Sequence, residues 1–147
     1  MSVSKSPRHH HYCIAVPDLE KAVGDFTRTL QLEFGPAREV TMRLVGHVGE
    51  TSHVVRFVYS TDGYIKFVET VPGDGLFGDE PSRGFHLVGC HADTDLDEAI
   101  AGAVSEGEEV DDKLYVGNVT IAAFFKPTAL RPVRIELLSP SIGEVRQ

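Results

Sequence analysis

The chain has 147 residues, of which 41% are hydrophobic and 24% are charged, so it can bury one compact core. Its formal net charge of −8 argues against nucleic acid or an anionic membrane surface as a partner, and no apolar run is long enough to span a membrane. The first residues lack the apolar segment of a secretory signal. We therefore expect a single domain over residues 1–147, a cytoplasmic location and small molecules as partners.

The first part of the chain predicts a strand, a helix and three further strands. An alternating segment from His11 to Val16 is followed by Asp18, a favourable N-cap for a helix whose apolar residues recur with the helical period. Gly35 lies beyond the end of that helix. Three strand candidates follow over about 38–45, 53–59 and 64–71, with a hairpin turn at 61–63.

Residues 73–84 are rich in Gly and Pro and predict a loop that joins two halves. The second half repeats the order of elements: a strand over 86–92, a helix with Leu96 and Ile100 on its apolar face, and strands near 113–116, 119–125 and 133–138. We interpret the chain as an internal duplication, with module one at about 9–72 and module two at about 85–140.

The duplication brings a histidine to the start of one strand in each module, His11 in the first and His86 in the second. Two such strands can meet at a pseudo-twofold axis, where one metal ion can use both imidazoles. Glu136 lies in an apolar closing strand, where an unpaired buried carboxylate is costly and a metal partner accounts for it. Aligning the two closing strands makes Lys66 the counterpart of Glu136. A gapless alignment with an offset of 77, which pairs His9 with His86, ranks second.

Three motifs then carry a family resemblance: His-x-x-Ile-x-Val-x-Asp-Leu from His11, a second strand-opening histidine after the Gly-rich joint, and a closing Ile-Glu-Leu-Leu. Together they resemble the vicinal oxygen chelate superfamily, which includes glyoxalase I, methylmalonyl-CoA epimerase, extradiol dioxygenases and bleomycin-resistance-type binding proteins. The resemblance extends from about His11 to Pro140. It implies an α+β fold in which two tandem βαβββ modules form a curled mixed sheet around a shared cavity.

The resemblance also implies a set of metal-ligand positions, which fall on His11, Lys66, His86 and Glu136. Lys66 departs from the pattern, because an ammonium group has no lone pair to donate. The remaining two histidines and one carboxylate suit one divalent ion such as Fe, Mn, Co, Ni or Zn. We therefore predict metal ligation by His11, His86 and Glu136.

Lys66 and Glu136 are the predicted catalytic residues. Lys66 has three interpretations: a solvent-facing strand residue, a cationic anchor for a substrate carboxylate or phosphate, or an acid or base. Glu69 is out of phase with Lys66 on its strand and should point away from the cavity. Cys13 and Cys90 are expected to be free thiols on the strand faces of His11 and His86. Further strand residues that no spacing rule ranks are Arg43, His47, His53, Arg56 and Tyr59.

Three functions remain open. The first is a metal-dependent isomerase, epimerase or lyase that acts on a small, vicinally oxygenated metabolite through a metal-stabilised enediolate. The second is an extradiol-like Fe(II) dioxygenase, which the three-ligand set favours. The third is a metal-free protein that binds an antibiotic or another small molecule. A chain of this kind and size is also expected to form a homodimer, which covers exposed sheet edges.

Overall fold

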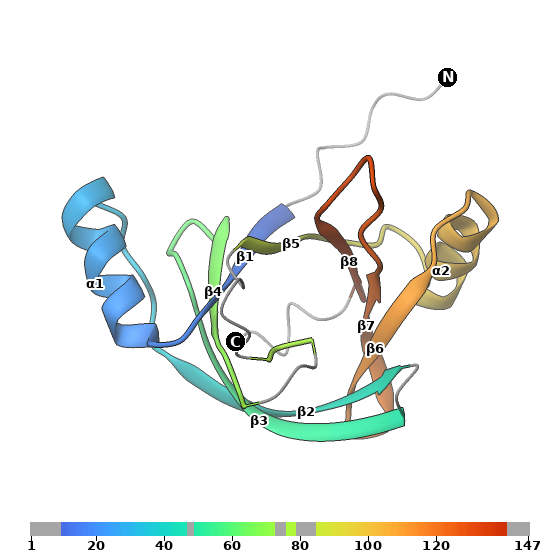
Figure 1. Cartoon of the computed structure of the whole chain (residues 1–147), viewed down its shortest axis with the longest axis horizontal. Coiled ribbons are helices and arrows are strands. Elements are labelled where there is room, and N and C mark those ends of the chain that lie inside the picture. The colour runs from blue at the N-terminus through green and yellow to red at the C-terminus, as the bar shows by residue number, and fades with distance from the viewer. Residues whose placement is uncertain (1–9, 47–48, 73–75, 79–84, 141–147) are drawn as a thin grey trace.

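The computed structural model describes residues 10–46, 49–72, 76–78 and 85–140, and every side chain within them except those of Phe85 and His86. In this part of the chain, eight strands and two helices follow in the order βαβββ twice, as the sequence predicted (Figure 1). Neither helix is long and apolar enough to cross a membrane. The elements of module one are β1 (His10–Val16), α1 (Leu19–Leu30), β2 (Arg38–Gly46), β3 (Gly49–Tyr59) and β4 (Ile65–Glu69). Those of module two are β5 (Phe85–His91), α2 (Leu96–Ser105), β6 (Val110–Val116), β7 (Val119–Phe125) and β8 (Arg134–Leu138).

The strands form one mixed sheet that curls until its ends meet, in the order β1-β4-β3-β2-β6-β7-β8-β5. Within each module the first and last strands pair in parallel, β1 with β4 and β5 with β8. Equivalent strands of the two modules pair antiparallel at both seams, β1 with β5 and β2 with β6. This arrangement confirms the α+β fold with tandem modules around a shared interior.

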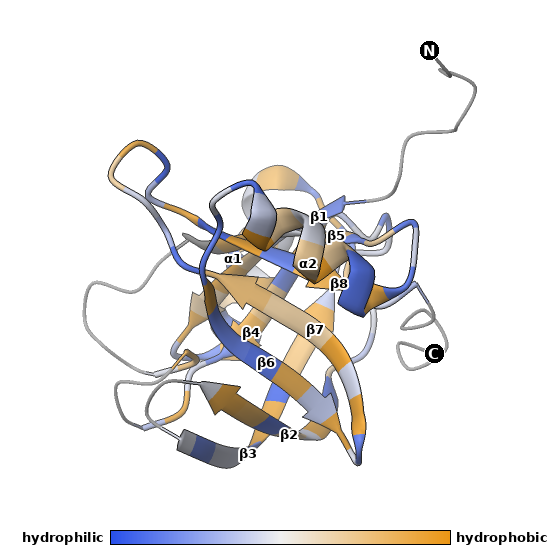
Figure 2. Ribbon diagram, turned by 90° about the vertical axis from the view of Figure 1, so that its right-hand side faces the viewer, coloured by the Kyte–Doolittle hydropathy of each residue, from blue (hydrophilic) through white to orange (hydrophobic). Residues whose placement is uncertain are grey.

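Both helices lie on the outside of the curled sheet, at opposite ends of the view in Figure 1. Asp18 and Asp95 cap them by accepting hydrogen bonds from backbone N–H groups of the first turn. Phe67 of β4 packs under α1 through Phe26, and Phe125 of β7 packs under α2. β7 therefore buries apolar residues on both of its faces, which Figure 2 shows as a largely hydrophobic strand beside the more hydrophilic β6.

The inner face of the sheet encloses a second apolar cluster. Leu76 and Phe77, from the segment that joins the modules, are buried within it, and the Phe77 ring meets Phe124 edge to face with 6.3 Å between centroids. The sequence predicted only a loop here, and residues 73–75 and 79–84 of that loop lie outside the described part. These two side chains fill part of the interior, and polar residues of β1, β4 and β8 line another part.

Two strands are longer than the sequence predicted: β6, which begins at Val110 rather than near residue 113, and β3. β3 begins at Gly49 rather than near residue 53, because its ladder with β2 continues down to the pair Gly46 and Gly49. Gly49 has φ +105°, a conformation that L side chains rarely adopt. The polar run that precedes His53 gave no alternation, so the ladder with β2 extends the strand beyond its sequence signal.

Candidate functional site

His11, Gly89 and Glu136 are in register on three neighbouring strands. His11 of β1 is opposite Gly89 of β5, and Gly89 is the parallel partner of Glu136 of β8. Residues at one level of adjacent strands face the same side of a sheet, here the interior. His11 Nε2 lies 3.2 Å from Glu136 Oε1, and the two residues are 1% and 3% exposed. Two of the predicted site residues therefore meet in the protein interior.

Gly89 makes that meeting possible, because any side chain at this position would occupy the same space. A Cβ atom on Gly89 would lie 2.5 Å from His11 Cε1 and 2.7 Å from Glu136 Oε1. Sequence reasoning did not single out Gly89. The signal was present, since an isolated glycine inside a strand pattern often marks a close approach of other groups.

Lys66 lies on the neighbouring strand and faces the same interior. Its backbone pairs with Cys13 of β1 on one side and with Tyr59 of β3 on the other. Its Nζ atom lies 5.0 Å from the centroid of the Phe57 ring and 5.4 Å from that of Tyr59. Tyr59 in turn meets the His11 ring edge to face, with 5.9 Å between centroids.

The surroundings keep Lys66 positively charged. Burial by itself lowers the pKa of Lys66, but Tyr59, Cys13 and Glu136 outweigh it, and the pKa lies above its ordinary value. Of the three interpretations of Lys66, this environment favours the cationic anchor over a solvent-facing residue or a base.

A cavity of about 160 Å³ opens onto Tyr59, Lys66 and Glu136. Arg38 and Glu39, both exposed, also line it. The rest of its wall is apolar and comes from both modules: Val40, Met42, Phe57, Leu114, Val116, Ile121 and Leu138. A second hollow of about 240 Å³ shares Arg38, Phe57 and Tyr59 with the first. The polar groups are thus presented at the wall of an otherwise apolar space, the usual composition of a small-molecule site.

His86, the third predicted metal ligand, is a residue of β5 whose side chain lies outside the described part. The ladder between β1 and β5 is irregular at this residue, because Cys13 pairs with Leu87 whereas Ile14 pairs with Phe85. The parallel ladders make Gly89 the counterpart of Cys13, so His86 corresponds to His10 rather than to His11. The expected repeat equivalence is therefore shifted by one residue, and ligation by His86 stays a prediction.

Cys13 is a buried packing residue rather than a cavity thiol. It is 2% exposed and belongs to the inner apolar cluster, and burial is the main reason that its pKa is raised to about 12. Cys90 is half-buried and its sulfur lies 3.6 Å from the backbone oxygen of His91. Both thiols are free, as expected.

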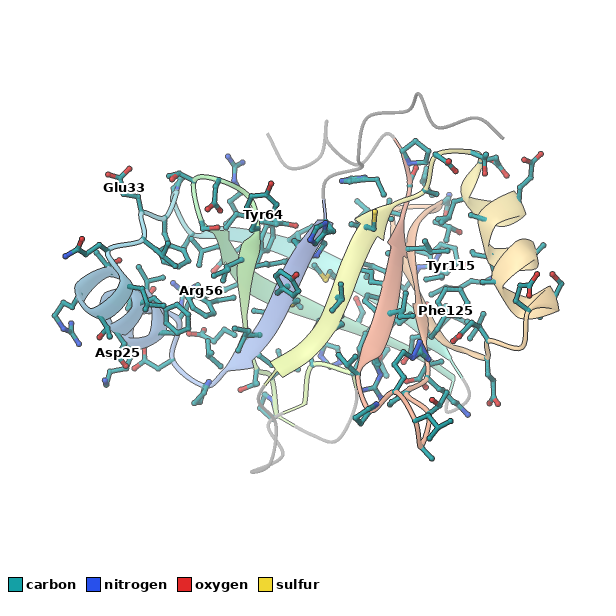
Figure 3. The ribbon with its side chains drawn as sticks, turned by 90° about the horizontal axis from the view of Figure 1, so that it is seen from above. Asp25, Glu33, Arg56, Tyr64, Tyr115 and Phe125 are labelled. Atoms are coloured by element: carbon teal, nitrogen blue, oxygen red, sulfur yellow. The ribbon has the colours of Figure 1, made fainter. Side chains whose placement is uncertain are left out.

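Among the five unranked strand residues, Tyr59 is one that lines the cavity. Arg43 stacks over Tyr115 with 4.4 Å between its Cζ atom and the ring centroid, and Figure 3 places Tyr115 on the side of module two. His53 belongs to β3 and is half-buried, whereas His47 lies outside the described part. Tyr59 carried no sequence signal beyond its place in a strand, because its contact with Lys66 depends on the β3–β4 register.

A cluster of Asp18, Glu20 and Glu69 groups three carboxylates near the start of α1. These groups already have cationic and N–H partners: Arg56 forms ion pairs with Glu20 and Glu69, and Glu69 accepts a hydrogen bond from the backbone N–H that begins α1. Arg56 lies between α1 and the sheet in Figure 3. The cluster therefore anchors the helix to the sheet, and Glu69 points away from the cavity, as predicted.

Comparison with known proteins gives structural relatives only. No family model matches the chain, and no curated protein matches it. A methylmalonyl-CoA epimerase variant from Streptomyces coelicolor, in complex with 2-nitronate-propionyl-CoA, superimposes with a TM-score of 0.60 at 20% identity, covering 91% of this chain and 97% of the other. The epimerase from Mycobacterium tuberculosis gives 0.60 at 17% identity, covering 93% and 90%. A hypothetical protein from Bacillus halodurans C-125 gives 0.63 at 16% identity, covering 89% and 92%. The chain thus has the vicinal oxygen chelate fold that its sequence predicted.

Proposed function

We propose that this chain, which has the vicinal oxygen chelate fold, is an isomerase or epimerase that moves a proton on a small oxygenated molecule with the help of one divalent metal ion. The observation that carries the proposal is the buried contact of 3.2 Å between His11 and Glu136, beside a cavity that also holds Lys66. The structural relatives that act as methylmalonyl-CoA epimerases support this reaction class.

The donor atoms of His11 and Glu136 suit a metal ion. Nitrogen and oxygen ligands bind first-row ions at about 2.0–2.2 Å, so two ligands at a right angle lie roughly 3 Å apart. The separation of 3.2 Å between Nε2 and Oε1 agrees with that geometry. We propose His86 as the third ligand. When bound, the ion polarises a substrate carbonyl and stabilises the negative charge of an enolate.

The side chains of the cavity have complementary roles in such a reaction. A carboxylate such as Glu136 takes the proton from the carbon next to the carbonyl group. Lys66 holds a positive charge in the same cavity, where it attracts the oxygen that gains negative charge. The apolar walls exclude water, which strengthens each of these interactions.

A metal-free binding protein is the second candidate, and Lys66 is the observation that favours it. The side chain puts a covalently attached cation into the cavity, at the repeat counterpart of Glu136. Such a cation offsets the carboxylate without any metal ion. The described cavity residues give neither the extradiol-like dioxygenase nor the lyase support over proton transfer.

Metal analysis and isotope exchange test the proposal together. Protein purified without added metal should contain about one divalent ion per chain, and His86→Ala and Glu136→Ala should lose most of it. His53→Ala is the matched control, since His53 is a half-buried strand histidine outside the ligand set. Metal retained at wild-type stoichiometry in both ligand variants would contradict the site.

Proton exchange in D2O, followed by NMR, tests the reaction on 3-oxo acids, 2-hydroxy ketones and acyl-CoA thioesters, beginning with methylmalonyl-CoA. Exchange should require Glu136 and should persist in Glu33→Gln, which removes an exposed carboxylate. Tight binding of these compounds without exchange, by protein that holds no metal, would favour the metal-free binding protein instead.

A further inference from the structure

We propose that Leu76 and Phe77 set the depth of the cavity and thereby restrict its ligand to a short carbon chain. These two side chains, the Leu76–Phe77 plug, come from the segment that joins the modules. This inference rests on the proposed function and deepens it, because it assigns the size of the substrate that the same cavity accepts. Its test measures binding rather than turnover.

The plug is unusual for a connecting segment, because both of its side chains are buried. Leu76 and Phe77 are each 4% exposed and belong to the inner apolar cluster. Connecting segments normally run over the surface of a protein. In Figure 1, residues 76–78 lie within the ring of strands. The segment therefore occupies interior space of the curled sheet.

Backbone and side-chain contacts hold the plug in place. The N–H group of Val71, just beyond β4, donates a hydrogen bond of 2.8 Å to the backbone oxygen of Phe77. Val71 and Gly78 also form a parallel β-bridge. The Phe77 ring meets Phe124 of β7 edge to face, and such ring pairs add stability beyond the burial of their area. The plug is thus anchored to both modules.

The plug lies beyond the cavity along the axis of the curled sheet. Ile121 lines the cavity near the start of β7, whereas Phe124, which meets the plug, lies near the end of that strand. Lys66 lines the cavity near the start of β4, whereas Val71, which holds the plug, lies beyond its end. The ladders make β4 and β7 run in the same direction. Both strands therefore place the plug on the same side of the cavity.

The cavity wall and the plug belong to one apolar cluster, which contains five residues of the wall: Met42, Phe57, Leu114, Ile121 and Leu138. Because the strands close into a ring, a longer ligand extends along the axis of the sheet. Toward the exposed Arg38, added carbon atoms stay in contact with water and contribute little affinity. In the other direction they meet the cluster, where the plug fills the space.

The size of the cavity agrees with a plug that limits ligand length. Its volume of about 160 Å³ is below the ~300–1,000 Å³ of sites for drug-sized molecules. Removal of one large apolar side chain from a protein core can leave a dry cavity of roughly 150 Å³ that binds small apolar molecules. Met42, a flexible side chain of both the wall and the cluster, can move into part of such a space. Truncation of Phe77 should therefore deepen the cavity.

Ligand-observed NMR titrations with straight-chain 2-alkanones, from 2-butanone to 2-octanone, test the inference in the presence of a chelator. Each methylene group that enters an apolar site tightens binding about 4-fold. For the wild-type protein this gain should stop within the series, where the chain fills the cavity. In Phe77→Ala it should continue for about two further carbon atoms, so that 2-octanone binds about 10-fold more tightly than it binds the wild type. Leu76→Ala should show a smaller gain in the same direction.

Phe125→Ala is the matched control, because Phe125 is a buried phenylalanine of β7 that packs under α2 on the outer face. It should lower the stability as Phe77→Ala does but keep the wild-type dependence on chain length. Competition shows whether the new space is continuous with the cavity, since 2-pentanone should then displace 2-octanone from Phe77→Ala. If either alanine variant fails to fold, Phe77→Leu and Phe125→Leu replace the pair, with an expected gain of about 4-fold for Phe77→Leu.

The same dependence on chain length in the Phe77 variant and the wild type overturns the inference, and so does an equal gain in the Phe125 variant. Simultaneous binding of both ketones also overturns it, because the truncation would then have opened a separate cavity. A wild-type protein that binds none of the ketones, or whose gain continues to 2-octanone, has no such limit and overturns it as well. Proton exchange in D2O is judged independently. A deeper cavity in Phe77→Ala without any exchange by the wild type leaves the role of the plug standing and refutes the proposed reaction.

Discussion

Replacing Gly89 by alanine tests the central feature of the site, the contact of His11 and Glu136 across β5. The added Cβ would lie 2.5 Å from His11 Cε1, 2.7 Å from Glu136 Oε1 and 2.8 Å from His11 Nε2. Carbon atoms in ordinary contact are about 3.5–4.0 Å apart, so the imidazole ring or the β5 backbone must move by about 1 Å. Both side chains are buried, and neither can turn into solvent without a larger rearrangement.

Two magnitudes follow from that displacement. Overpacking of this kind lowers the free energy of unfolding by about 1–3 kcal/mol. For a chain of this length, each kcal/mol shifts the Tm by about 3 °C, so Gly89→Ala should melt roughly 3–9 °C below the wild type. A misplacement of about 1 Å in a catalytic group lowers the rate about 100-fold. Metal affinity should fall as well, because the two proposed ligands no longer meet at their present separation.

Thermal and urea unfolding, metal titration and the exchange assay measure these effects on one protein preparation. Gly102→Ala is the control, since Gly102 lies in α2 with nothing within 4 Å of an added Cβ. Alanine in a helix interior should raise the free energy of unfolding by about 0.5–1 kcal/mol and leave metal binding unchanged. A Gly89→Ala protein with wild-type stability and wild-type metal affinity would refute the argument that the close approach at Gly89 forms the site.

Further expectations concern single residues and assembly. Lys66→Glu should tighten metal binding, because the new carboxylate adds a fourth ligand to the proposed set. A competition titration that shows no gain in metal affinity would contradict the placement of Lys66 beside the metal ligands. Iodoacetamide at pH 8 should label Cys90 well before Cys13, whose pKa is raised to about 12 by burial, and equal labelling rates would count against that environment. The folded state holds the Cys13 proton more strongly than the unfolded state, so the free energy of unfolding should fall as the pH rises from about 9 toward 12, which urea titrations at several pH values can follow. Asp18→Ala should lower the free energy of unfolding by about 1 kcal/mol through loss of the α1 cap. Light scattering at micromolar concentration should give a homodimer, and a monomer would contradict the predicted assembly.

The features that the sequence determined are local or repeated. Asp18 and Asp95 cap their helices because a carboxylate can reach the first N–H groups of the same turn, whatever the rest of the fold does. The alternation within β1 and the repeat of βαβββ likewise need only neighbouring residues or a comparison of two segments. His11 and Glu136 could be proposed as members of one site because the duplication predicts a pseudo-twofold axis at which strands of the two modules meet.

The tertiary structure decided which residues share a level of the sheet. A shift of one residue along a strand changes the face of every side chain, and the register of the β1–β5 and β5–β8 ladders places Gly89, rather than His86, between His11 and Glu136. The insertion of Phe77 into the interior depends on how the curled sheet closes. The pairing of Tyr59 with Lys66 depends on the register of the β3–β4 hairpin. Ladder register and closure are set by contacts between residues that are distant in the chain, and no local pattern records them.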